Sequence, residues 1–396
     1  MNSLNTIPNE IILLILDNFE STSDLKIAKA ICKKWRDSVN YFMKSKRKCQ
    51  IDIKIQYISI ITNHIFPNYI VNAWTARQIR KALKTSMIIV GGIDQKTPRH
   101  VAKVCRNLII GPAKLDLPDL PYEIGVYDAE LRPSMVVNDS GELLYCGLKN
   151  CWVLRDHKWN FHSEFAEYIF DKVVVQMSNG TYAFGGYTFD NQKNQRFCQT
   201  SYFLPNGSKQ WETGPSIPYY EFSEGSALAI SSTELILVGG KSIYGNGAIL
   251  KFNIITNNWT VVGNLQEARE GCFAAIFNQK IIVCNGRNYY TFGDDLKSTE
   301  ILPFKIKELP SGEKVAQFMP IRKGGDTNSV RCHGAIGVVQ LEDSEKLVKL
   351  NLFQPAEEWN DETETWHIST HFASNPLSHS GRSTAFISKA THFLPF

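Results

Sequence analysis

The sequence predicts a small all-α N-terminal domain followed by an all-β propeller of six blades. Two observations predict this architecture. Residues 7–39 carry apolar side chains at helical spacing, whereas the chain from residue 87 onward repeats short apolar segments, most of which end in glycine. The expected division is a helical domain over residues 1–45, a packed connector over 46–86 and the propeller over 87–396.

Composition is that of an ordinary globular protein: 396 residues, 43% hydrophobic and 21% charged. The net charge of +4 is modest and does not indicate a nucleic-acid partner. The apolar run at residues 11–16 is too short for a signal-peptide core or a membrane span. We therefore expect an intracellular protein of the cytoplasm, the nucleus or both, with no membrane association.

The nine cysteines form no Cys-x-x-Cys pair. Cys146 and Cys151 are the closest two, and no matching His or Cys pair lies near them in the sequence. Zinc usually needs four converging ligands in two close-spaced pairs. We expect no metal site, and thiols that stay reduced.

The N-terminal residues predict two or three short helices. Pro8 suits the first turn of a helix, and Ser23 is a candidate N-cap for the next one, with Asp24 favourable in its first turn. Chains of about forty residues seldom fold alone without disulfides, metal or a partner. The apolar faces of these helices therefore need cover from a partner helix or from the rest of the chain.

The stretch IPNEIILLILDNFESTSDLKIAKAICKKWRDSV (7–39) resembles an F-box. The resemblance implies that the segment binds a Skp-family adaptor and, through it, a cullin. The residues implied at this interface are Ile7, Pro8, Ile11, Leu14, Ile15, Leu25, Cys32 and Trp35. Ile7 departs from the leucine usual in the family, a nearly isosteric change. The alternative is a helical hairpin packed on the chain's own C-terminal domain.

Residues 44–48, KSKRK, allow two interpretations: a nuclear-localisation patch or a solvated helix end. The connector contains an alternating segment at 51–61 and a candidate helix at 73–83. Its apolar content indicates a packed spacer rather than a flexible linker.

Six apolar segments define the repeat of the C-terminal part. They occupy residues 87–92, 143–147, 181–186, 235–240, 281–286 and 346–352, and the last lacks glycines. A further strand candidate precedes five of them, at 133–137, 172–177, 226–230, 272–277 and 335–339. The first segment lacks such a partner, so we expect residues 383–388 to pair with it and close the ring. Seven blades are the main alternative to six.

A tryptophan follows most of these strand pairs: Trp159, Trp211, Trp259 and Trp366. Such a side chain can bury on the order of 200 Å² and wedge between neighbouring sheets. This pattern of double glycines and tryptophans resembles the kelch repeat. We interpret both residue types as structural rather than functional.

Motifs of enzyme chemistry are missing from the sequence. It contains no phosphate-binding GxxxxGK[ST], no GxSxG and no sialidase-type repeat, and its nine histidines form no copper-oxidase pattern. We expect no cofactor and no enzymatic activity.

Four expected inner strands follow an arginine: Arg132, Arg269, Arg331 and Arg382, while Asp171 and Glu224 precede the other two. If the strands are equivalent, these side chains surround the mouth of the central channel. Each arginine either bonds the carbonyls of the neighbouring blade or helps to bind carboxylate or phosphate groups of a target. The second interpretation predicts an acidic or phosphorylated target protein.

Jointly, the two resemblances imply the substrate-recognition adaptor of an SCF-type E3 ubiquitin ligase. The F-box would bind the Skp-family adaptor, and the propeller would hold the target protein. Two alternatives remain at this point: an F-box/kelch scaffold without ligase activity, and a propeller enzyme whose helical N-terminus is incidental.

Overall fold

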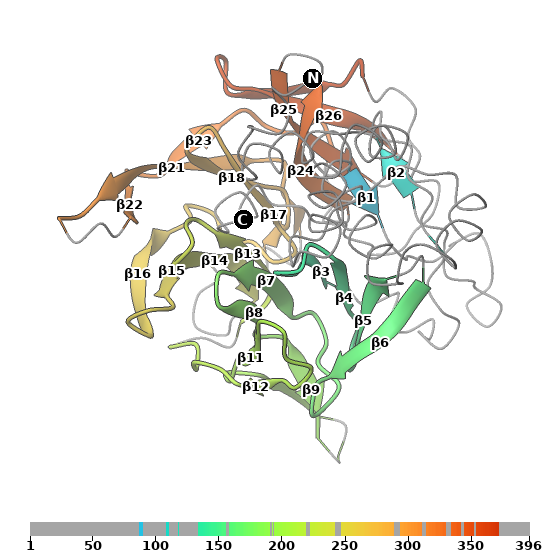
Figure 1. The fold of residues 1–396 in the computed structure, drawn as a ribbon. Helices are drawn as coiled ribbons and strands as arrows, with labels where there is room; N and C mark the ends of the chain where they lie inside the picture. The colour runs from blue at the N-terminus through green and yellow to red at the C-terminus, as the bar shows by residue number, and fades with distance from the viewer. Residues whose placement is uncertain are drawn as a thin grey trace, which may run out of the picture.

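The computed structural model is all-β in the part that it describes, with sheets arranged as the blades of a propeller (Figure 1). It describes residues 134–371 apart from short gaps (156–157, 191, 193, 219–221, 242–246, 289–293, 311–313, 330–333, 342–343 and 352–353), together with residues 87–89, 108–110 and 118. These residues contain no helix. The expected domain at 1–45 and connector at 46–86 lie outside them.

Five blades follow one another along the chain, each an antiparallel sheet. The first blade has strands β3 (Ser134–Val137), β4 (Leu143–Cys146), β5 (Asn150–Arg155) and β6 (Lys158–Glu164). The second has β7 (Val173–Met177), β8 (Gly180–Phe184), β11 (Tyr202–Pro205) and β12 (Glu212–Thr213). The third has β13 (Ser223–Ala229), β14 (Glu234–Lys241), β15 (Ala248–Asn253) and β16 (Asn258–Asn264).

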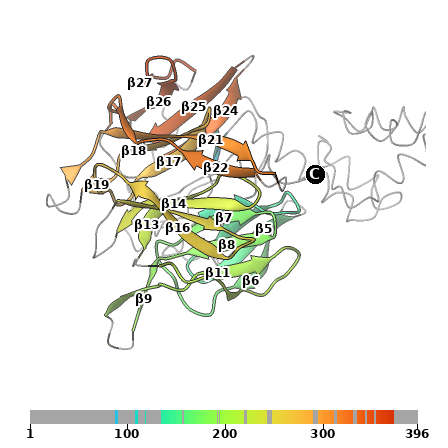
Figure 2. The same cartoon turned by 90° about the vertical axis from the view of Figure 1, so that its left-hand side faces the viewer.

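The fourth blade has β17 (Phe273–Phe277), β18 (Lys280–Cys284), β21 (Thr299–Glu308) and β22 (Lys314–Phe318), and β23 (Arg322–Gly324) pairs with the first part of β21. The fifth has β24 (Gly334–Leu341), β25 (Ser344–Asn351), β26 (Gln354–Asn360) and β27 (Thr365–Ile368). Two hairpins, β9 (Tyr187–Phe189) with β10 (Gln195–Phe197) and β19 (Arg287–Asn288) with β20 (Asp294–Asp295), extend the second and fourth blades at the same end of the ring (Figure 2).

The inner strands β3, β7, β13, β17 and β24 pack side by side in this order. Among the described residues, β24 and β3, at the two ends of the series, are not packed against each other in this way. The two-stranded sheet of β1 (Met87–Ile89) and β2 (Leu108–Ile110) lies in the view between these two blades (Figure 1). Residues 383–388, expected to close the ring, lie outside the described residues, so the structure describes five of the six expected blades.

Burial explains why the glycine-ended segments were recognisable as strands. Every residue of β4 and β8 is buried. For β8 the reason is visible, since the first and third blades cover the two faces of its sheet. The outer strand β16 is mostly exposed or half-buried. The first glycine of each pair packs against the next blade: a Cβ on Gly185 (φ +63°) would lie 2.0 Å from the main-chain oxygen of Phe222.

Two tryptophans, Trp211 and Trp259, join neighbouring blades as expected. Trp211 of the second blade stacks on Phe165 at 4.4 Å between ring centroids and donates to Ser163 Oγ at the end of the first blade. Trp259 of the third blade lies 5.5 Å from Phe184 of the second. The expectation that these side chains wedge between neighbouring sheets is therefore confirmed for Trp211 and Trp259.

Candidate functional site: a buried polar network between blades

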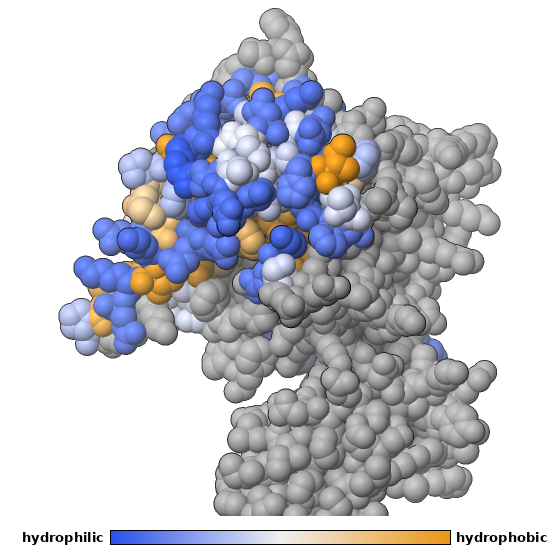
Figure 3. Space-filling model, turned by 90° about the horizontal axis from the view of Figure 1, so that it is seen from above, coloured by the Kyte–Doolittle hydropathy of each residue, from blue (hydrophilic) through white to orange (hydrophobic). Residues whose placement is uncertain are grey.

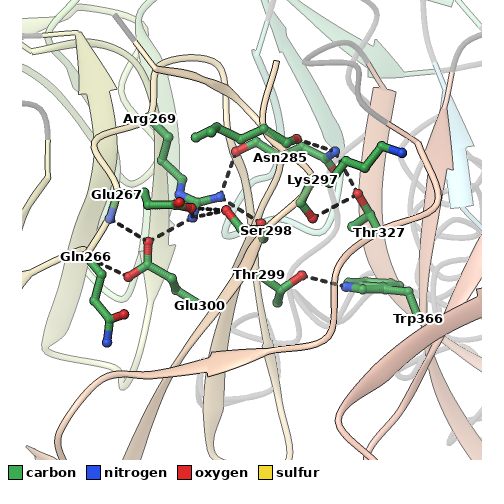
Figure 4. Close-up of polar contacts among 11 residues, drawn as sticks. Gln266, Glu267, Arg269, Asn285, Lys297, Ser298, Thr299, Glu300, Thr327 and Trp366 are labelled. Atoms are coloured by element: carbon green, nitrogen blue, oxygen red, sulfur yellow. Dashed lines mark hydrogen bonds and ion pairs between the residues drawn. The ribbon is translucent and has the colours of Figure 1, made fainter. Parts of the chain in front are cut away.

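Arg269, one of the four arginines singled out from the sequence, lies in the loop that connects β16 to β17. Its side chain is 0% exposed. Nη1 donates to the main-chain oxygens of Asn285 and Ser298, both at 2.9 Å. Nη2 donates to Glu300 Oε1 at 2.8 Å and to Ser298 Oγ at 3.0 Å (Figure 4). The guanidinium thus fastens the start of β17 to the loop and strand that follow β18.

Glu300, on β21, is the main counter-charge of Arg269 and is also buried. Its carboxylate accepts the backbone N–H groups of Gln266 at 2.6 Å and Glu267 at 3.1 Å (Figure 4). A buried carboxylate is tolerated when it is paired and hydrogen-bonded, and Glu300 meets both conditions. The pair therefore fixes the path of the chain before β17.

Lys349, on β25 of the fifth blade, is the centre of a second buried cluster. Its Nζ lies 2.9 Å from Glu357 Oε1 and donates to Ser329 Oγ at 3.0 Å. It also lies 5.5 Å from the centroid of the Trp366 ring. Trp366 in turn donates from Nε1 to Thr299 Oγ1 of the fourth blade at 3.0 Å (Figure 4).

Asn285 links the two clusters. Its main-chain oxygen accepts from Arg269, while its Oδ1 accepts from Lys349 Nζ at 2.9 Å. Asn285 occupies the place of the first glycine in the double-glycine pairs and has φ +57°, a conformation that asparagine tolerates better than most residues. The asparagine thus keeps the glycine backbone and adds a side chain that bridges two blades.

Electrostatics inside the network favour the ionised form of Glu357. Although burial by itself raises the pKa of this carboxyl, the charge of Lys349 and hydrogen bonds from Ser329, Lys349 and Asn328 hold it below its ordinary value. Glu357 is therefore a carboxylate at neutral pH, already occupied by protein donors. The arrangement can hold neighbouring blades together.

The expected place at the channel mouth is wrong for Arg269, because its side chain is buried and bound to the protein's own groups. Of the two interpretations left open for this arginine, its position favours bonds within the propeller over binding of a target. The equivalence with Asp171 and Glu224 is also wrong, because these two residues match Gly271: all three have positive φ. Backbone hydrogen bonds connect them in series, from Glu224 N to Asp171 O and from Gly271 N to Glu224 O.

Arg269 instead matches Phe222 of the third blade. The second glycine of the preceding blade donates to the main-chain oxygen of each: Gly186 to Phe222 and Gly240 to Arg269. The sequence comparison aligned Asp171 and Glu224 with Arg269, whereas the structure aligns them with Gly271, two residues later.

The remaining candidate residues lie outside the described residues. These are the target-binding candidates Arg132, Arg331 and Arg382 and the eight residues of the expected adaptor interface, Ile7, Pro8, Ile11, Leu14, Ile15, Leu25, Cys32 and Trp35. Sequence reasoning missed Lys349 and Asn285, although a lysine inside the apolar run KLVKLNL was a visible signal of a buried charge.

Among the described residues, no group of three or more His, Cys, Asp or Glu side chains could hold a metal ion. Cys146 and Cys151 are paired neighbours on β4 and β5, and both thiols are free. In the part of the chain that the structure describes, no helix is long and apolar enough to cross a membrane.

Comparison with known proteins gives a limited result. No family model and no curated protein matches the chain. Among solved structures, a protein described as "Structure of YjhT" is similar, with a TM-score of 0.48 and 12% sequence identity over 64% of this chain and 85% of that one.

Proposed function

We propose that the chain is the substrate-recognition adaptor of an SCF-type E3 ubiquitin ligase. The observation that carries the proposal is the F-box-like segment at residues 7–39, in which the anchor residues occur in the order and spacing of that family. The five described blades support the other half of the proposal, because a propeller offers a rigid surface to a target. The F-box would bind a Skp-family adaptor, and through it a cullin.

The proposed propeller is kelch-type with six blades. The sixth blade would contain the sheet of β1 and β2 and the strand expected at residues 383–388. Two observations support this count: β1 and β2 pair as an antiparallel sheet, and β3 and β24, the first and last inner strands of the described series, are not packed together as the other neighbours are. A blade between these two would close the ring.

On this proposal the chain acts by proximity. Holding the target beside the charged ubiquitin carrier raises the effective concentration of the target's lysines there. The chemistry of ubiquitin transfer belongs to the partner proteins, so the chain itself needs no cofactor and no catalytic residue. It would act inside the cell, in the cytoplasm or the nucleus.

Affinity purification from cells treated with a proteasome inhibitor tests the proposal. The full chain should recover a Skp-family adaptor, a cullin and a target protein, whereas a chain that lacks residues 1–45 should recover the target alone. Recovery of the adaptor without a cullin would favour a scaffold, and recovery of neither would contradict the proposal.

A further inference from the structure

A hollow of about 510 Å³ lies on the fourth blade, at the end of β17 opposite to Arg269. It is bordered by the β17–β18 turn, the middle of β21 and the segment between β22 and β23. The lining residues are Asn278, Gln279, Lys280, Pro303, Phe304, Lys305, Met319, Pro320 and Arg322. Its volume falls in the usual range of ligand pockets, about 300–1,000 Å³.

The apolar part of the hollow can receive one apolar side chain. Phe304 is buried beneath it, Pro303 and Pro320 lie beside it, and Met319 is 38% exposed. Large exposed apolar groups are few in the described residues. The described surface in Figure 3 is mainly hydrophilic, with hydrophobic residues in small separate groups. Pockets that accept one apolar anchor dominate the free energy of many protein interfaces.

Three cations line the hollow, and no acidic residue does. Two of them are held in place from the fifth blade: Lys280 lies 2.8 Å from Asp361, and Arg322 Nη2 donates to Glu364 at 2.6 Å. Although burial by itself lowers the pKa of Lys280, its hydrogen bonds to Asp361 and Glu364 raise it above the ordinary value. Lys280 therefore stays charged at neutral pH.

The third cation, Lys305, is exposed. It forms no ion pair within the described residues. With Lys280 and Arg322 balanced by two acids, Lys305 leaves the rim with an excess positive charge. This charge next to an apolar pocket is complementary to a segment that carries Asp or Glu beside an apolar residue.

We propose that this hollow binds an acidic segment of a partner protein, with one apolar side chain in the pocket and a neighbouring carboxylate on Lys305. That this partner is the target of a ligase rests on the proposed function, whereas the binding itself does not. The acidic target expected from the sequence is thus assigned to a different surface from the buried Arg269, at the other end of the blade.

Fluorescence anisotropy with labelled peptides on the full chain tests this site. The probe is acetyl-Asp-Glu-Leu-Asp-Glu-amide, compared with the same peptide carrying Ser in place of Leu and with acetyl-Lys-Lys-Leu-Lys-Lys-amide. Lys305→Glu and Met319→Asp should each weaken binding of the Leu probe about tenfold or more, since each removes one of the two complementary features. Lys323→Glu is the matched control, because Lys323 is exposed on β23 and does not line the hollow.

The expected result is preference for the Leu probe over both others, lost in Lys305→Glu and Met319→Asp and kept in Lys323→Glu. Equal loss in the Lys323 control, equal binding of the three peptides, or no binding would overturn the proposal. If Lys305→Glu lowers the melting temperature, Lys305→Ala replaces it. Recovery of the Skp-family adaptor with the Lys305 variant is measured in parallel, so that failure of this site and failure of the adaptor function are distinguishable.

Discussion

Lys349 of the fifth blade donates from Nζ to Oδ1 of Asn285 of the fourth blade at 2.9 Å, and both side chains are fully buried. The two residues are 64 positions apart in the sequence. The contact therefore joins two blades through a charged side chain. At the equivalent position of the double-glycine pairs, the first glycine offers only its backbone groups. It makes the stability of this boundary depend on charged groups.

Replacing Lys349 with Met should destabilise the propeller by about 3–5 kcal/mol, because Glu357 would be left buried without its counter-charge. Urea unfolding monitored by tryptophan fluorescence measures the change. Lys307→Met, at an exposed position of β21, is the control and should shift the free energy of unfolding by less than about 0.5 kcal/mol. Adding Glu357→Gln to Lys349→Met should recover part of the loss, and further destabilisation by the second change would argue against the pair.

The lowered pKa of Glu357 predicts a pH dependence with a definite sign. A carboxyl with a pKa lower in the folded than in the unfolded chain stabilises the fold above its ordinary value of 4.5. That contribution disappears as the pH falls through the folded value. The melting-temperature advantage of the wild type over Glu357→Gln should therefore shrink over the range below the ordinary value of 4.5. An advantage that stays constant over this range would show that ionisation of Glu357 does not contribute.

Arg269→Ala should act on stability, because its guanidinium is buried and paired with Glu300. Loss of one partner of such a pair costs about 3–5 kcal/mol, and Arg269→Lys should restore only part of it, since an ammonium cannot donate to Asn285, Ser298 and Glu300 in the same geometry. Arg196→Ala, at an exposed position of β10, is the matched control. The melting temperatures of the three variants measure these effects. An Arg269→Ala variant as stable as the control would contradict a structural role for Arg269.

Two buried thiols should resist alkylation in the folded protein. Burial raises the pKa of Cys284 to about 12 and that of Cys198 to about 11, and the thiolate is the reactive form. Iodoacetamide at pH 8 should leave both unmodified in buffer and modify both in urea, as measured by peptide mass spectrometry. Rapid modification of Cys284 without denaturant would contradict the packing of the fourth blade.

The repeat could be predicted from the sequence because it is encoded locally. Strands such as β8 and β14 are continuous apolar runs ended by glycines, and each expected strand within the described residues is present. The polar network could not be predicted, since its partners come from different blades and depend on register. Arg269 and Asp171 both precede an inner strand, but their positions relative to that strand differ by two residues. Arg269 therefore lies in the buried polar network, whereas Asp171 lies in the series of backbone hydrogen bonds with Glu224 and Gly271.

The proposed adaptor function depends most directly on the proposed N-terminal interface, so the decisive measurement is co-purification of a Skp-family adaptor with a Pro8→Ala/Ile11→Ala variant of the full chain. Loss of an interface anchor costs about 2 kcal/mol or more, a factor of roughly thirty in affinity. We predict that the variant loses the adaptor while its propeller melts at the wild-type temperature. Undiminished recovery of the adaptor by this variant, or no recovery by the wild type, would contradict the account.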